Sequence, residues 1–370
     1  MTGFVFPRLI FWALALAVLI SCASPRYAPP ASDGAALAGE ERAALQGAMD
    51  TALARRARVY DLAWPVLAAN TALCPNVSPS IGLVLADRGL LATMAGGLRE
   101  RDLEALGIEE GLHIVHAMAG APAGQAGLAA GMTLMAVEGE AVAKPGAAGK
   151  AIRQTLEEKD TVTLTVGGGS ESRTLTITGT RACAMPVKIS QSQAINAHAA
   201  SGDIVIYTGL IRALTDDALQ FVIAHEAAHL AERHPRKYWR NLAVSGGVVT
   251  GPLLYAGATL ADMGAKAIGQ RPDISVTARS LRLIAPWSTH FEAEADYLGL
   301  YMVARAGGDL TGAREAFDVF SREAPRSIYT KSTHPVTPER LVALQAAVEE
   351  IEAKREAGMP LLPNEVSHGQ

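Results

Sequence analysis

The stretch Ala224-His225-Glu226-Ala227-Ala228-His229-Leu230 carries two histidines four residues apart, with a glutamate directly after the first. Residues i and i+4 of a helix share one face, so both imidazoles would point to the same spot. This pattern is typical of helices that hold a zinc ion and keep a glutamate beside the metal to activate water. The stretch therefore predicts a helix that carries part of a metal site.

The residues around this motif contain clear helix signals. Thr215 can cap the N-terminus, and Asp216 and Asp217 fall in the first turn, where the helix dipole favours negative charge. No proline or glycine follows before Pro235. We therefore expect a helix from Thr215 to shortly before Pro235. The alternative interpretation is two histidines on a core-facing helix, because so short a pattern also arises by chance.

A catalytic zinc ion takes a third protein ligand and leaves the fourth position to water. A histidine ten residues after the first would mark the metzincin pattern, but that position is Pro235. Farther along, residues 291–307 read as a second helix with Glu292 and Asp296 one turn apart on one face. Glu292 is the expected third ligand. Glu294 is the alternative, but it points to a different side of the helix.

Further short motifs accompany these two helices. Taken in this order, they resemble the HtpX and CAAX-prenyl-protease family of zinc metallopeptidases, which is family forty-eight of the gluzincin type. The resemblance extends over roughly residues 183–345, about half of the chain. The matching pieces lie at residues 196–199, 204–210, 224–230, 292–296, 332–335 and 339–340.

The resemblance implies a zinc endopeptidase that acts on polypeptides with one zinc ion per chain. It implies His225, His229 and Glu292 as the zinc ligands and Glu226 as the general base. Asp296 would then orient a ligating histidine or assist proton transfer, as carboxylates behind zinc ligands do.

His334 precedes Pro335 in an expected loop, and the resemblance implies that it approaches the metal. There it would stabilise the oxyanion, or occupy the fourth site and hold the enzyme off. A loop histidine with a local hydrogen bond is the alternative. We expect His234 to be solvated at the helix end. The family often has a Ser-Arg pair before its glutamate, and this chain has Ser288-Thr289 instead.

The N-terminus predicts a leader. Residues 4–20 are almost purely apolar, and residues 1–21 resemble a bacterial lipoprotein signal peptide that ends before Cys22. Cleavage would leave Cys22 lipidated, with residues 22–40 as a flexible tether rich in Pro, Ala, Ser and Gly. We expect the periplasmic side of the outer membrane. Inner-membrane anchoring or a soluble periplasmic protein are the alternatives.

The chain has three cysteines. With Cys22 lipidated, Cys74 and Cys183 remain as one pair in an oxidising compartment, so we predict a disulfide between them. It would close a loop of about 110 residues, for which the chain-entropy model gives about 4 to 5 kcal/mol of stabilisation. Two independent buried thiols are the alternative.

Residues 74–182 alternate strand, short-helix and strand signals with glycine turns, and a hairpin is expected from residues 161–166 and 173–178. The series resembles a PDZ domain of the bacterial envelope-protease kind. The resemblance implies that an extended peptide, often a C-terminus, adds to a sheet edge. Leu106-Gly107-Ile108 is the candidate loop for its carboxylate. A rigid spacer is the alternative.

The predicted fold class is α+β. We expect an N-terminal helix over residues 41–73 that packs on the peptidase domain, and a mainly helical peptidase domain over residues 183–357. A small strand pair is expected over residues 196–207, whose edge could align a substrate backbone. Residues 358–370 would form a loosely ordered tail.

The composition limits the function classes. Hydrophobic residues make up 49% of the chain and charged ones 19%, which predicts packed globular structure, and a net charge of -4 gives no footprint for nucleic acid. Residues 242–261 are uncharged and predict a buried hairpin or lid, with membrane contact as the alternative. A zinc endopeptidase is the leading function. A non-catalytic zinc-containing PDZ chaperone or assembly scaffold is the alternative.

Overall fold

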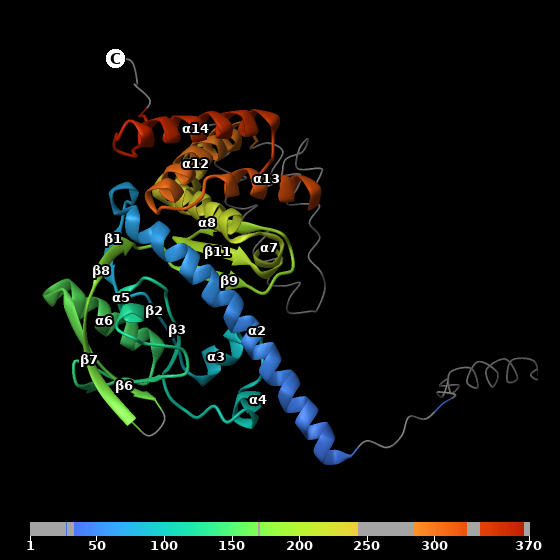
Figure 1. Cartoon of the computed structure of the whole chain (residues 1–370), viewed down its shortest axis with the longest axis vertical. Coiled ribbons are helices and arrows are strands. Elements are labelled where there is room, and N and C mark those ends of the chain that lie inside the picture. Colours follow the sequence, from blue (N-terminus) through green and yellow to red (C-terminus); the bar gives the residue numbers. More distant parts are fainter. Residues whose placement is uncertain (1–26, 28–32, 169–170, 243–284, 324–333, 366–370) are drawn as a thin grey trace, which may run out of the picture. The chain divides into compact units, whose positions relative to one another are not determined.

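The computed structural model describes residues 27, 33–168, 171–242, 285–323 and 334–365, whose elements are drawn in Figure 1. The leader with Cys22 and residues 243–261 of the apolar run lie outside these described residues. The chain divides into two compact units, residues 1–44 and residues 45–370. The second unit contains both the strand-rich and the helix-rich part of the chain.

Helix α2 (Gly34–Ala69) is longer than the helix expected from the sequence. It begins inside the predicted tether, because Asp33 accepts a hydrogen bond from the Ala35 amide and residues 35–38 are alanine and leucine, which are strong helix formers. The buried Val59, Ala63 and Val66 join the main hydrophobic core. A short 3-10 helix, η1 (Thr71–Leu73), follows.

The strand-rich part, residues 74–182, contains a six-stranded antiparallel sheet. The path of the sheet is β2-β3-β4-β6-β7, and β5 pairs only with β4. Val162, Leu164 and Val166 alternate inward along β6, which forms the expected hairpin with β7 and packs with helix α6. The elements are β2 (Leu83–Ala86), β3 (His113–Ala117), α5 (Pro122–Gln125), β4 (Thr133–Val137), β5 (Glu140–Ala141), α6 (Pro145–Lys159), β6 (Thr161–Gly168) and β7 (Glu171–Thr178).

The connection between β2 and β3 is helical, which the sequence reasoning did not anticipate. It contains α3 (Arg88–Met94) and α4 (Glu100–Ala105). The amides of Leu106, Gly107 and Ile108 all donate to carbonyl groups of residues 102–104 at the end of α4. The prediction that this loop receives a peptide carboxylate is therefore wrong, because none of the three amide donors is free.

The predicted disulfide between Cys74 and Cys183 is confirmed, with the two Cα atoms 5.7 Å apart. Directly beside it, β1 (Val77–Ser80) pairs antiparallel with β8 (Thr180–Cys183). The bond and the strand pair bring together the two ends of a segment that is 109 residues long.

The helix-rich part begins with a three-stranded sheet in the order β10-β11-β9. The expected strand pair is confirmed as the antiparallel β10 and β11, and β9 adds to β11 in parallel. The described residues after β11 are mainly helical as far as Glu356. The elements are β9 (Val187–Ser190), β10 (Ala197–Ala200), β11 (Asp203–Tyr207), α7 (Thr208–Ala213), α8 (Asp216–Ala231), α9 (His234–Leu242), α12 (Ala285–Arg305), α13 (Thr311–Glu323) and α14 (Pro338–Glu356).

Helix α8 lies at the centre of the helix-rich part and is buried from Ala218 to His229. A helix that is buried on all sides must be apolar all round, apart from side chains with a function. Glycines allow its neighbours to come close: a Cβ at Gly299 of α12 would lie 3.1 Å from the backbone of His225, and one at Gly312 of α13 would lie 2.3 Å from Asp217. The helix with the histidine motif is therefore held between α12 and α13.

The C-terminal residues are attached to the helices and are not a loose tail as far as residue 364. The carbonyl of Leu361 accepts a hydrogen bond from Arg305, and that of Leu362 accepts one from Lys354. Asn364 contacts Tyr297 and Glu350.

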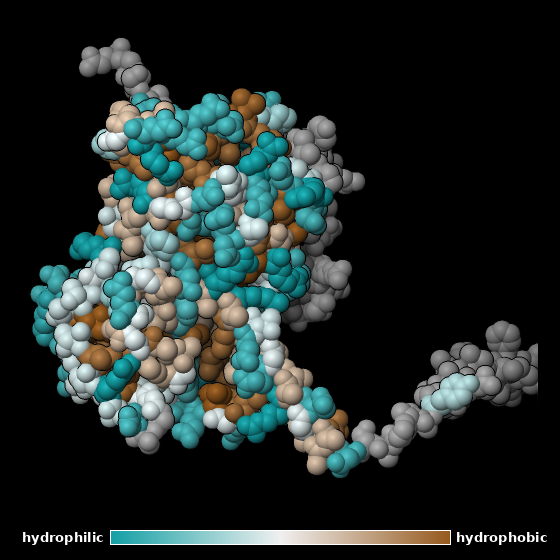
Figure 2. All heavy atoms as spheres, viewed as in Figure 1, coloured by the Kyte–Doolittle hydropathy of each residue, from teal (hydrophilic) through white to brown (hydrophobic). Residues whose placement is uncertain are grey.

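Few large apolar side chains are exposed in the part of the chain that the structure describes. On the face shown in Figure 2, hydrophilic side chains cover much of α13 and α14, and hydrophobic ones show mainly between the elements. Among the described residues, no helix combines the length and the apolar character that crossing a bilayer requires.

Candidate metal centre

Helix α8 carries His225, Glu226 and His229 in its last two turns. The hydroxyl of Thr215 accepts a hydrogen bond from the Ala218 amide and so caps the helix as expected. The two histidines are one turn apart and 5% and 8% exposed. Both imidazoles are thus fixed within the core, where a polar group requires a partner.

Helix α12 carries Glu292 and Asp296 on the face that packs against α8. The close contact at Gly299 allows this packing, because any larger side chain there would press on His225. Glu292 and Asp296 are 4% and 3% exposed. The structure therefore brings together the two helices that the sequence linked only by motif.

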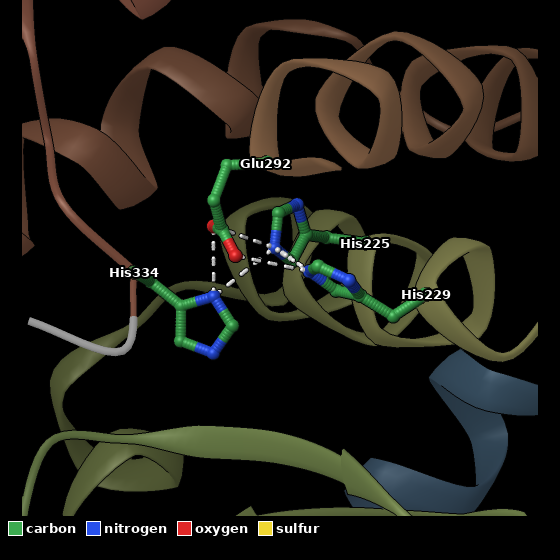
Figure 3. A group of neighbouring side chains, drawn as sticks. All are labelled: His225, His229, Glu292 and His334. Atoms are coloured by element: carbon green, nitrogen blue, oxygen red, sulfur yellow. Dashed lines mark hydrogen bonds and ion pairs between the residues drawn. The ribbon is translucent and has the colours of Figure 1, made fainter. Parts of the chain in front are cut away.

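Four side chains from three parts of the chain converge on one point (Figure 3). The Nε2 atoms of His225 and His229 are 3.0 Å apart, and the carboxylate of Glu292 lies 3.5 Å and 3.3 Å from them. His334 Nδ1 lies 2.9 Å from Glu292 and 3.3 Å from His225 Nε2. All four ligand atoms fall within 4.8 Å of one another.

These spacings fit one small divalent cation. Donors that surround a zinc ion tetrahedrally at about 2.1 Å are roughly 3.4 Å apart. The observed distances of 2.9 to 3.5 Å between neighbouring donors agree with this value. The donor set of imidazole nitrogens and one carboxylate is the chemistry that zinc prefers.

Glu226 points into the same space from the residue next to His225. Its side chain is 1% exposed, and its Oε2 atom has no hydrogen-bond partner among the described residues. Its Oε1 atom lies 3.4 Å from His334 Nε2. A buried carboxylate oxygen without a partner is costly, so this atom fits a role in which it binds a water molecule at the centre.

Behind His225 lies a buried ion pair. His225 Nδ1 is 3.0 Å from Asp296, and Asp296 accepts two hydrogen bonds of 2.7 Å from Arg340 of α14. Arg340 also reaches Glu292, with Nη1 3.1 Å from its carboxylate. The contact at Nδ1 leaves Nε2 of His225 to face the centre. Arg340 belongs to the matching piece at residues 339–340, but the sequence reasoning gave it no role at the site.

The buried charges shift the pKa values in the cluster. Burial lowers the pKa of His225, but hydrogen bonds and charge from Asp296 and Glu292 outweigh it and raise this pKa to about 10. Burial raises the pKa of Glu292, but the charge of His334 and hydrogen bonds from the histidines bring it well below its usual range. Burial lowers the pKa of His229. Without a metal, the cluster therefore holds a proton at neutral pH.

Behind His229 lies a second chain of contacts. His234 Nδ1 is 2.9 Å from His229 Nδ1, and His234 Nε2 is 2.9 Å from Glu294. The expectation that His234 is solvated is wrong, because the turn after α8 leads it back into the core, where it is 3% exposed. Glu294, the alternative ligand, is bonded to His234 and stands outside the four-residue cluster.

A small pocket lies between the cluster and the edge strand β10. Phe221, Phe317 and Phe320 line its apolar side, and Glu226 and His334 line its polar side. Ala197 of β10 forms part of its wall.

Comparisons with known proteins agree with this geometry. Residues 179–348 match the model of peptidase family M48. The segment is similar to the mitochondrial metalloendopeptidase OMA1 of Schizosaccharomyces pombe, with 27% identity over 42% of this chain and 44% of the relative. OMA1 of Arabidopsis thaliana is 32% identical over a segment that covers 40% of this chain and 28% of the relative. The metalloprotease LoiP of Escherichia coli K12 is 26% identical over a segment that covers 41% of this chain and 58% of the relative. The matches thus span less than two thirds of each of these relatives.

Proposed function

We propose that this protein is a zinc-dependent endopeptidase, because residues 179–348 match the model of peptidase family M48 and are similar to proteins named as metalloendopeptidases or metalloproteases. The observation that carries the proposal is the convergence of three donors, from His225, His229 and Glu292, beside the unpartnered Oε2 atom of Glu226. A purely structural zinc site would not need a base at this position.

His225, His229 and Glu292 hold the zinc ion in this proposal. Zinc, when bound, acidifies water toward neutral pH and polarises a peptide carbonyl. Glu226 accepts the proton of the attacking water at its unpartnered oxygen and later gives it to the leaving amine nitrogen. Asp296 keeps His225 in the tautomer whose Nε2 faces the metal.

His334 is the fourth donor at the centre, beside two imidazole nitrogens and one carboxylate oxygen. Its distances of 2.9 Å to Glu292 and 3.3 Å to His225 support the proposal that it takes the fourth position at the metal, which water or a substrate oxygen would otherwise occupy. His334 therefore holds the described conformation inactive, and substrate binding displaces it. In the displaced position its ring can donate a hydrogen bond to the oxyanion.

The substrate backbone lies along β10, which is the end strand of its sheet and borders the pocket. An extended peptide can add to such an edge through main-chain hydrogen bonds, which hold the scissile bond still over the metal. The three phenylalanines of the pocket favour an apolar side chain next to the cleaved bond.

The test is the substitution Glu226→Gln, which keeps the shape of the side chain and removes the base. Zinc content should stay at one ion per chain, while cleavage of an unfolded protein such as casein falls by a factor on the order of a hundred or more. Glu349→Gln, an exposed position on α14, is the matched control and should cleave normally. Persistent cleavage by Glu226→Gln would mean that the base is misassigned.

A non-catalytic scaffold is the alternative function. His334→Ala should be assayed beside the wild type, because a latent enzyme would gain activity when the fourth donor is removed. If neither protein cleaves any unfolded substrate while both bind zinc, the scaffold function is favoured.

We infer a peptide-binding role for the PDZ-like residues 74–182. Support comes from β2, which is an end strand of its sheet and contacts α6. Peptides would add to this free edge, in place of the loop at Leu106 first expected. A fluorescent peptide with an apolar C-terminus should bind to Glu226→Gln protein, and amidation of its terminus should weaken binding about tenfold if the carboxylate is recognised.

The disulfide supports a location outside the reducing cytosol, since such bonds persist in oxidising compartments. Together with the leader and Cys22 in the sequence, it favours a lipid-anchored protein on the periplasmic side of the bacterial outer membrane. Metabolic labelling with a fatty-acid analogue, lost in Cys22→Ser, tests the anchor.

A further inference from the structure

We propose that His234 and Glu294 are positioning residues that fix the orientation and the tautomer of His229 for zinc binding. This inference rests on the proposed function, because it assigns the groups that support one of the proposed zinc ligands. The observation that carries it is a continuous row of contacts from the centre to the surface, formed by His229, His234 and Glu294.

The hydrogen-bond chemistry of this row allows one consistent arrangement. His229 turns Nε2 toward Glu292, so its proton belongs on Nδ1, which lies 2.9 Å from His234 Nδ1. His229 then donates and His234 accepts at Nδ1, which places the proton of His234 on Nε2. That proton is donated to Glu294, 2.9 Å away. Each donor meets an acceptor, and Nε2 of His229 is left free for the metal.

The backbone after α8 is shaped to bring His234 to this place. Helix α8 ends at Ala231. Arg233 then adopts a φ of +54°, in the left-handed region that residues other than glycine seldom occupy. This turn starts α9 at His234 and directs its ring back under His229. Such a backbone conformation is strained, so the surrounding contacts must hold it.

Packing holds the His234 ring in one plane. Phe291 stacks on it, with ring centres 4.6 Å apart and an interplanar angle of 22°. Phe291 directly precedes Glu292, and Glu294 lies two residues farther on. One turn of α12 therefore supplies a ligand for the metal and, from its other side, the support for His229.

Each histidine of α8 thus has a polar group at its Nδ1 atom. His225 has Asp296 at its Nδ1 atom, and His229 has the His234-Glu294 pair at its own. Removing such groups from behind a metal ligand commonly weakens metal binding by 10- to 100-fold. A second metal ion held by Glu232, His234 and Glu294 is the competing explanation for the cluster. It is disfavoured because both nitrogens of His234 already have partners and Lys237 Nζ lies 2.7 Å from Glu232.

The test measures zinc affinity of the full-length protein by competition with a chromophoric chelator, which needs no catalytic activity. His234→Leu should weaken binding 10- to 100-fold, whereas His234→Asn, whose side-chain oxygen can accept from His229 Nδ1, should recover most of the affinity. Glu294→Ala should give an intermediate loss. His113→Leu in β3, whose ring forms a hydrogen bond with the Glu109 carbonyl far from the centre in the sequence, is the control and should bind as the wild type. Circular dichroism must show equal folding.

A spectroscopic signature separates positioning from mere stability. In protein labelled with 15N histidine and loaded with zinc, the Nδ1 nitrogen of His229 should carry a hydrogen-bonded proton, and this signal should shift in His234→Leu and return in His234→Asn. Equal zinc affinity for His234→Leu and wild type, or no recovery in His234→Asn, would overturn the inference. Binding of two zinc ions by wild type but only one by His234→Leu would favour the second metal site. If the wild type binds no zinc, the proposed function itself fails.

Discussion

Arg340 and Asp296 form a buried ion pair in which the guanidinium donates two parallel hydrogen bonds of 2.7 Å to the carboxylate. The remaining donor, Nη1, lies 2.5 Å from the carbonyl oxygen of Pro335, the residue after His334. The pair therefore connects α12, α14 and the loop that carries the fourth donor. Arg340 thus contacts both the carboxylate that lies beside His225 and the residue that follows His334.

Removing this arginine should be costly for stability. In Arg340→Gln the carboxylate of Asp296 is left buried without its partner, for which we expect a loss of about 3 to 5 kcal/mol in the free energy of unfolding, measured with urea. Arg314→Gln breaks an exposed pair with Asp318 and should cost at most about 1 kcal/mol. Equal effects of the two changes would contradict the importance of the buried pair.

Zinc binding should release protons at neutral pH. His225 has its pKa raised to about 10 in the metal-free protein, so it is protonated at pH 7 and must lose this proton to bind zinc. We expect release of about one proton per zinc, measured by calorimetry in buffers of different ionisation enthalpy, and affinity that increases with pH up to about 10. Asp296→Asn should reduce the release. Heats that do not depend on the buffer would contradict this prediction.

The same shift affects the stability of the metal-free protein. Because the folded pKa of His225 lies above its usual value, its contribution to stability is fully present below pH 6.5 and is lost as the pH rises through about 10. The chelator-treated wild type should therefore lose stability between these pH values, and Asp296→Asn should lose less across the same range. Thermal unfolding at fixed ionic strength measures both.

The disulfide should add substantial stability. The chain-entropy model gives about 4 to 5 kcal/mol for a loop of this length, so the double variant Cys74→Ser, Cys183→Ser should unfold at a much lower urea concentration. Reduction of the wild type should have the same effect, and reduction of the double variant should have none. A loss below about 1 kcal/mol would show that the strand pair β1–β8 alone holds the two ends.

The contact at Gly299 should set the distance between the two metal-binding helices. In Gly299→Ala the new methyl group would meet the His225 backbone at 3.1 Å, which pushes α12 away from α8 by a few tenths of an ångström. We expect weaker zinc binding at nearly unchanged helix content. Gly149→Ala on α6 has open space and is the matched control, with a slight gain in stability.

Local signals in the sequence were enough to predict much of the site. The capped helix of the histidine motif, the i and i+4 carboxylates of α12 and the strand pair before α8 all have patterns within a few residues. The pairing of Cys74 with Cys183 followed from their number and the expected compartment. Glu226 was placed because it adjoins a proposed ligand.

What could not be predicted depends on contacts between distant residues. Arg340 reaches Asp296 across 44 positions, and no local pattern indicates that partner. His234 was expected in solvent because the sequence does not reveal the left-handed turn at Arg233. Arginine rarely adopts this backbone conformation. The loop at Leu106 looked open because the helical segment before it, whose carbonyls occupy its amides, was not recognised.

The segment between Cys74 and Cys183 begins and ends at a disulfide, where the two Cα atoms are 5.7 Å apart. A segment whose two ends lie so close together can be replaced as a unit. Another domain with neighbouring termini could take its place without altering the path from α2 to the histidine helix. The strand-rich segment and the helix-rich part can therefore change separately, because neither must be rebuilt when the other changes.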